Sequence, residues 1–186
     1  MKKIITITGD LGSGKSTVSK ILIEKLNYDY IYTGKIQREI ADRYRMTTLE
    51  LNQYAETHPE IDEEIDSTFK TLNESTNLIV DSRMAWFFIP DSFKVYLKTD
   101  VVVAAARILN DNQRKSEKKC ETLEEAVQSI EARKTSENQR YMDLYGADSS
   151  NMLNFNLIID TTRATPEETA DKIIIEFQNV INQLLS

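Results

Sequence analysis

Short apolar runs alternate with longer segments of helical periodicity along this chain. After the first run, the apolar residues at 18, 21, 22, 23 and 26 predict a helix that Ser16 or Thr17 caps. Short continuous strands that alternate with helices are typical of a parallel sheet covered on both faces. The pattern therefore predicts an α/β fold with a five-stranded parallel sheet and helices on both faces. The expected strands lie at residues 4–8, 30–32, 78–80, 93–97 and 157–159.

Two intervals depart from this alternation. Residues 36–72 are charged and helical in pattern, are interrupted at His58 and Pro59, and contain no strand candidate. We expect them to form a helical insert between the second and third strands. The second interval opens with a charged loop that has the composition of an active-site cover, so we expect a short lid near 110–120. No repeat or low-complexity linker divides the chain, so residues 1–186 are expected to form a single domain.

Composition and charge narrow the classes of partner. The chain has 186 residues, of which 40% are hydrophobic, and a formal net charge of −7 with a pI near 4.9. Such a surface repels polyanions, so we expect neither nucleic acid nor an anionic membrane as a partner. No run reaches the roughly 18 apolar residues of a membrane span, and the first residues do not lead into a signal-peptide core. We expect a cytoplasmic monomer that acts on small molecules, with no metal or disulfide role for Cys120 or His58.

A phosphate-binding motif lies between the first strand and the first helix. Residues 9–16, Gly-Asp-Leu-Gly-Ser-Gly-Lys-Ser, fit the P-loop pattern GxxxxGK[ST] in the strand-to-helix context that it requires. Glycines let successive N–H groups point at phosphate oxygens, and the following helix adds its positive dipole end. We expect a P-loop NTPase fold in which Lys15 reaches the β- and γ-phosphates of ATP and Ser16 holds Mg²⁺. A glycine-rich turn with a chance lysine is the alternative. The expected ATP-binding residues of the loop are Gly9, Asp10, Leu11, Gly12, Ser13, Gly14, Lys15, Ser16 and Thr17.

The same loop occurs in switch GTPases, which bind nucleotide without a phosphoryl acceptor. A guanine-specific GTPase normally carries an Asn/Thr-Lys-x-Asp element after a later strand. The nearest string here, at residues 97–100, is Leu-Lys-Thr-Asp and lacks the Asn or Thr. The incomplete element argues against a guanine-specific GTPase. A non-catalytic nucleotide-binding regulator stays as the alternative from another class.

Arginines lie where a second phosphate group would bind. Phosphoryl transfer between two anions requires positive charge on both sides of the transferred group, because the transition state spreads negative charge over the phosphoryl oxygens. Arg38 lies one turn into the helix after the second strand, and Arg83 follows the third strand. Ligands of open α/β sheets gather at the carboxyl ends of the strands, so both arginines are expected at the P-loop crevice rather than on the solvated surface. Asp81, at the end of the third strand, is expected to hold magnesium water or else to cap the next helix.

A third group of charged residues shares one helical face. Arg133, Glu137 and Arg140 lie at i, i+4 and i+7, directly after the expected lid. An exposed helix with surface salt bridges would have the same spacing. The position beside the lid favours a face that neutralises phosphate charge and excludes water.

The chain resembles the nucleoside monophosphate kinases, and most closely the short cytidylate kinases of archaea and some bacteria. The resemblance runs nearly from end to end. The P-loop is generic, whereas Tyr-Ala-Glu-Thr-His-Pro-Glu-Ile-Asp at 54–62 and the segments within 133–148 are more particular to these kinases. The segments that carry it are 9–16, 33–39, 54–62, 81–83, 103–107, 133–141 and 144–148.

This resemblance implies an activity and a set of roles. The activity is ATP- and Mg²⁺-dependent phosphoryl transfer to a nucleoside monophosphate, with CMP and dCMP favoured; another small acceptor or the regulator remains the alternative. The insert would bind the monophosphate, and Arg107 would lie against the adenine near residues 160–162. Lys35 departs from the family, where Asp is frequent and helps to hold magnesium water. The implied catalytic residues are Lys15, Arg133 and Arg140, and the implied acceptor-binding residues are Gly34, Arg38, Arg83, Arg133, Glu137 and Arg140.

Overall fold

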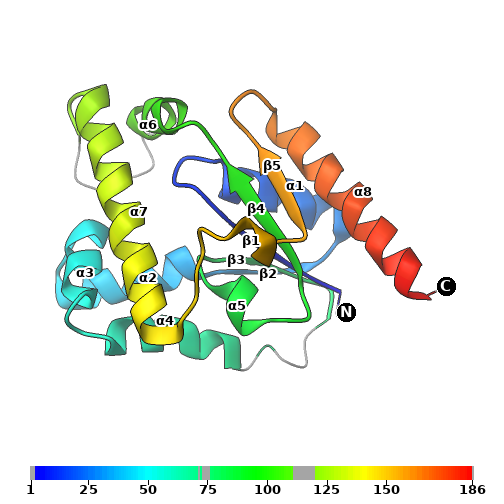
Figure 1. The fold of residues 1–186 in the computed structure, drawn as a ribbon, viewed down its shortest axis with the longest axis horizontal. Helices are drawn as coiled ribbons and strands as arrows, with labels where there is room; N and C mark the ends of the chain where they lie inside the picture. The colour runs from blue at the N-terminus through cyan, green and yellow to red at the C-terminus, as the bar shows by residue number, and fades with distance from the viewer. Residues whose placement is uncertain (1–2, 71, 73–75, 111–119, 186) are drawn as a thin grey trace.

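The computed structural model describes residues 3–70, 72, 76–110 and 120–185, and it has the predicted five-stranded parallel sheet (Figure 1). All neighbouring strands are parallel, in the order β2-β3-β1-β4-β5. The prediction of a P-loop α/β fold is confirmed. The strands are β1 (Ile4–Gly9), β2 (Asp29–Tyr32), β3 (Leu78–Asp81), β4 (Phe93–Lys98) and β5 (Leu157–Asp160).

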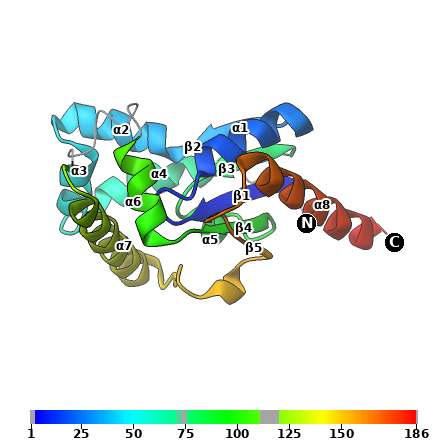
Figure 2. The same ribbon diagram turned by 90° about the horizontal axis from the view of Figure 1, so that it is seen from above.

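Helices cover both faces of this sheet, as Figures 1 and 2 show. None of the helices in the described residues combines the length and the hydrophobicity that crossing a membrane requires. The helices are α1 (Lys15–Leu26), α2 (Thr33–Tyr44), α3 (Thr48–Ala55), α4 (Glu60–Lys70), α5 (Ala85–Phe88), α6 (Val101–Leu109), α7 (Leu123–Tyr145), the 3-10 turn η1 (Met152–Asn154) and α8 (Pro166–Leu185).

The alternation of side chains along β1 divides the core into two layers. Ile5 and Ile7 pack in the cluster that α1 and α8 complete, whereas Ile4 packs in the cluster that includes α5. Thr6 and Thr8 share the face of Ile4, and the Thr8 hydroxyl donates to the Arg83 carbonyl at 3.2 Å. The carboxyl end of the central strand therefore presents a polar side chain toward the residues that follow β3.

Three helices, α2, α3 and α4, lie between β2 and β3 and form a small core of their own around Ile40, Leu51 and Ile61. The first of them begins at Thr33, directly after β2, and therefore earlier than the predicted position 36. The helices gather with α7 beyond the carboxyl ends of the strands (Figure 1). The predicted lid falls mostly on residues 111–119, which lie outside the described residues.

Candidate active site

The P-loop leaves β1 through a close approach to β4. The N–H of Asp10 donates to the Leu97 carbonyl at 2.9 Å, and a Cβ added to Gly9 would lie 2.2 Å from the same oxygen. Gly9 also has a φ of +144°, which side-chain-bearing residues rarely adopt. Glycine is thus required where the loop begins.

The start of α1 is open to an anion. The helix begins at Lys15 with Gly14 as its N-cap, at φ 85° and without a side-chain cap, so the predicted cap at Ser16 or Thr17 is wrong. First-turn N–H groups that no side chain caps can bind phosphate, and the helix dipole favours this. Ser13 is 2% exposed, and its Oγ has no hydrogen-bond partner among the described residues. These features fit the polyphosphate of a nucleotide.

Two cations converge on one carbonyl of this loop. The Lys15 ammonium donates to the Gly9 and Asp10 carbonyls at 2.9 and 2.8 Å, and Arg83 Nη1 donates to the Gly9 carbonyl at 3.0 Å. Burial and the Arg83 charge lower the pKa of Lys15 to about 7, although Asp81, Asp10 and Glu137 act in the opposite direction. An anion at this point would relieve the repulsion between the two cations.

Glu137 joins Arg83 to α7. Its carboxylate accepts from Arg133 Nε at 2.8 Å and lies 3.2 Å from Arg83 Nε, and its side chain is only 4% exposed. Burial alone would raise the pKa of Glu137, but Arg83, Arg133 and Arg140 lower it to about 2. The structure thus gathers three predicted site residues, and a carboxylate that stays ionised holds both arginines in place.

A serine and an aspartate provide oxygen atoms that suit Mg²⁺. Ser16 Oγ donates to Asp81 Oδ2 at 3.3 Å, and the Tyr30 hydroxyl donates to the same oxygen at 3.4 Å. Burial raises the pKa of Asp81, while Lys15 and the Ser16 hydrogen bond oppose that shift. Mg²⁺ prefers oxygen ligands and keeps several waters, so Ser16 and Asp81 fit the predicted ion. Lys35 pairs with Glu39 at 3.7 Å and is mostly exposed.

The predicted acceptor residues of α2 surround one aromatic ring. Arg38 donates to the Tyr32 hydroxyl at 3.2 Å, and its guanidinium lies 5.1 Å from the centre of the Tyr32 ring. A Cβ added to Gly34 would lie 2.4 Å from that ring. Tyr32 also stacks on Tyr30, whose hydroxyl reaches Asp81. Gly34 therefore makes room for the ring that supports Arg38.

Arg107 links the P-loop to the segment that follows β5. It donates to the Gly12 carbonyl at 3.2 Å and to the Thr161 carbonyl at 2.8 Å. The Thr161 hydroxyl in turn donates to the Ser13 carbonyl at 3.0 Å. Arg107 thus lies beside residues 160–162, the segment that the sequence analysis placed around the adenine.

Arg140 is the predicted site residue that the structure directs elsewhere. Its guanidinium binds the Asp62 carboxylate at 2.9 and 3.4 Å and the Asn52 carbonyl at 3.2 Å, and both charged side chains are almost fully buried. Arg140 therefore ties α7 to the insert, whereas Arg133 and Glu137 face Arg83. The i, i+7 spacing identified the helical face but not the acidic partner opposite its far end.

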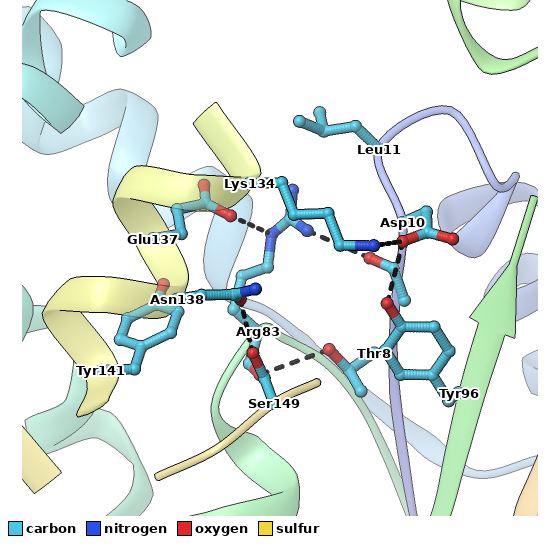
Figure 3. Close-up of a pocket in the computed structure, with 11 residues that line it drawn as sticks. Thr8, Asp10, Leu11, Arg83, Tyr96, Lys134, Glu137, Asn138, Tyr141 and Ser149 are labelled. Atoms are coloured by element: carbon cyan, nitrogen blue, oxygen red, sulfur yellow. Dashed lines mark hydrogen bonds and ion pairs between the residues drawn. The ribbon is translucent and has the colours of Figure 1, made fainter. Parts of the chain in front are cut away.

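A pocket between β1, the P-loop and α7 is lined by charges of both signs (Figure 3). Arg83 and Lys134 provide its positive charge, and Asp10 and Glu137 provide its negative charge. Sequence reasoning missed Lys134, because one lysine on a charged helix carries no signal of its own. The other lining residues are Thr8, Gly9, Leu11, Tyr96, Asn138, Tyr141 and Ser149.

The fold and this gathering of a P-loop lysine, a serine–aspartate pair and arginines from other elements define a P-loop phosphotransferase. Residues 4–163 match the model of the cytidylate kinase-like family. A cytidylate kinase of Sulfurisphaera tokodaii is 36% identical over 180 residues, which cover 95% of each chain. The chain therefore belongs to the cytidylate kinase-like family, and it is a nucleoside monophosphate kinase.

Two further similarities extend this comparison. An S-adenosylmethionine-dependent nucleotide dehydratase of Lacinutrix mariniflava is 35% identical over the whole of this chain, which spans only 38% of that protein. A shikimate kinase structure from Acinetobacter baumannii covers all of this chain and 97% of its own, with a TM-score of 0.61 at 17% identity. The latter similarity supports the fold alone.

Replacing Lys15 by Met is expected to abolish transfer and to raise the free energy of unfolding at about pH 6. The folded pKa of Lys15 is about 7 and the ordinary value is 10.5, so the unfolded chain binds more protons between these values. Stability rises with pH in that window, and the advantage of the variant should shrink by about pH 9.5. Urea unfolding at both pH values measures the difference in the free energy of unfolding between the variant and the wild type. Lys20→Met is the control, because Lys20 is exposed on the same helix. A less stable Lys15→Met protein at the lower pH would contradict this account.

Arg140→Met is expected to destabilise the protein by about 3 to 5 kcal/mol, because it leaves Asp62 buried without a partner. Adding Asp62→Leu should recover much of that loss, since both charges are then removed. Urea unfolding of the two single variants and the double variant measures the effect. A loss below about 1 kcal/mol for Arg140→Met would show that the pair does not hold α7 to the insert.

Proposed function

We propose that this kinase transfers the γ-phosphoryl group of ATP, with Mg²⁺, to CMP and dCMP. The observation that carries the proposal is the meeting of Lys15 and Arg83 on the Gly9 carbonyl, with Glu137 linking Arg83 to Arg133. In this proposal Lys15 binds the phosphate donor and Arg83 binds the acceptor. Because both donate to the Gly9 carbonyl oxygen, a phosphoryl group between them would lie within reach of both. The cytidylate kinase relatives support the choice of acceptor.

The reaction requires positive charge more than it requires a base. An acceptor monophosphate with a second pKa of about 6 is largely dianionic at neutral pH, so its oxygen attacks without losing a proton. That oxygen bonds to the γ-phosphorus as the bond to the β-bridging oxygen breaks, which gives ADP and a nucleoside diphosphate. Lys15, Arg83 and Arg133 donate to the phosphoryl oxygens and stabilise their spreading charge. Mg²⁺, held by Ser16 and Asp81, would offset further phosphate charge.

The acceptor side follows from the position of α2. Tyr32 orients Arg38, and Glu137 orients Arg83. The guanidinium groups of both arginines are therefore oriented before the acceptor phosphate binds. The insert at 36–72 binds the monophosphate in this proposal, and Glu137 acts on the arginines rather than on the phosphates, which a carboxylate would repel. Arg107 and residues 160–162 hold the adenine of ATP.

Other acceptors remain the competing candidates. A different nucleoside monophosphate or a small metabolite would use the same cations, because their contacts are to phosphate oxygens. The family and its cytidylate kinase relatives favour a kinase over the regulator alternative. The dehydratase activity belongs to the name of the Lacinutrix protein, of which this chain spans 38%.

A panel of nucleoside monophosphates with ATP and Mg²⁺, read as ADP release, tests the proposal. CMP and dCMP are expected to raise the rate far above that with water alone, and AMP, GMP and UMP are expected to raise it less. The Lys15→Met protein provides the background. Equal rates with every monophosphate and without any would contradict phosphoryl transfer, and preference for another base would contradict the choice of acceptor.

Arg38→Met is expected to raise the KM for CMP by roughly ten- to hundredfold and to leave the KM for ATP unchanged. The reason is that an ion pair present in both the ground state and the transition state contributes to binding alone. Arg43→Met is the matched control, because Arg43 is exposed on the same helix and pairs with Glu64. A fall in kcat without a change in the KM for CMP would show that Arg38 acts elsewhere.

A further inference from the structure

Lys134 of α7 reaches across the pocket to the P-loop. Its ammonium lies 2.7 Å from Asp10 Oδ1. Figure 3 shows the two side chains pointing toward each other. The lysine side chain is 51% exposed, but the Asp10 side chain is only 11% exposed. The ion pair thus joins a long helix to the loop that holds phosphate.

The Asp10 carboxylate is a fixed anchor for this contact. It accepts from the Tyr96 hydroxyl at 2.8 Å and from the Thr99 N–H at 3.0 Å. The Asp10 N–H is bound to the Leu97 carbonyl. Asp10 is therefore fixed at the carboxyl ends of β1 and β4, with neither its N–H nor its carboxylate turned to a phosphate. Burial would raise the pKa of Asp10, but the hydrogen bonds from Lys134, Thr99 and Tyr96 lower it, so the carboxylate stays charged.

A fixed negative charge in this position has a consequence for the reaction. Without compensation, it would repel the polyphosphate that the adjoining N–H groups bind. Lys134 offsets that charge from the helix that also carries Arg133 and Glu137. The distance between the P-loop and the arginines depends on where α7 lies, and small errors in that distance are costly in phosphoryl transfer.

We propose that Lys134 is a positioning residue, which seats α7 on the P-loop through Asp10 and thereby places Arg133 and Glu137 for transfer. The inference rests on the phosphoryl transfer proposed above. It assigns Asp10 a role in positioning in place of the ATP contact that the sequence suggested. The competing role for Lys134 is a direct contact with a phosphate, which would not require Asp10.

A double-mutant cycle separates these roles. Lys134→Met is expected to lower kcat about tenfold in the wild-type background and to leave it within about twofold in the Asp10→Asn background. The KM for CMP should change little in either case, and Lys134→Arg should retain most of the activity. The same factor in both backgrounds, or a change confined to the KM for ATP, would overturn the proposal.

Two measurements keep this test independent of the proposed acceptor. Wild-type protein that releases ADP no faster with any monophosphate than without one would refute the proposed function, whereas an active wild type without coupling would refute the positioning role alone. The same double-mutant cycle, measured in the free energy of unfolding, reports the coupling between Lys134 and Asp10 without turnover. Additive effects of the two substitutions there would also overturn the proposal. Lys25→Met removes another partly exposed lysine, which pairs with Asp171 between α1 and α8, and should leave kcat unchanged.

Discussion

Repulsion among cations gathered beside one loop is the constraint on which the rest of this structure depends. Lys15 and Arg83 share the Gly9 carbonyl, and Arg83 and Arg133 share the Glu137 carboxylate. Glu137 is nearly buried and stays ionised, so its negative charge offsets the repulsion between the two arginines. The same arrangement suits two phosphate chains, whose oxygens can replace a carbonyl or a carboxylate as partners of the cations.

The long helix α7 turns these local pairs into one arrangement. It contacts Arg83 through Glu137, the P-loop through Lys134 and the insert through Arg140. Each contact is an ion pair to a different part of the chain, and a rigid helix fixes the distances between them. The donor side, the acceptor side and the insert are therefore positioned by one element, which explains why charged residues recur along it.

The sequence predicted the five strands and the P-loop because β-branched runs and glycines have few structural alternatives. It also placed Arg83 at the P-loop crevice from its position after a strand, and Arg133 and Glu137 on one helical face from their i, i+4 spacing, whereas only the family resemblance assigned all three to one site. It misassigned the cap of α1, because the glycine conformation that starts the helix is not visible in a motif. The roles of Arg140 and Lys134 depend on which acidic groups lie opposite α7, and periodicity carries no such information. Cytoplasmic location, a monomeric state and the lid near 110–120 stay predictions.

Binding of a compound in which adenosine and cytidine are joined by five phosphates tests the central claim most directly. If Lys15, Arg83 and Arg133 serve both phosphate chains at once, calorimetry should give an affinity about a hundredfold or more above that of ATP or CMP, because the second half binds as part of the same molecule. Arg83→Met should remove most of that gain. An affinity for the joined compound no greater than that for ATP would contradict a shared set of cations between donor and acceptor.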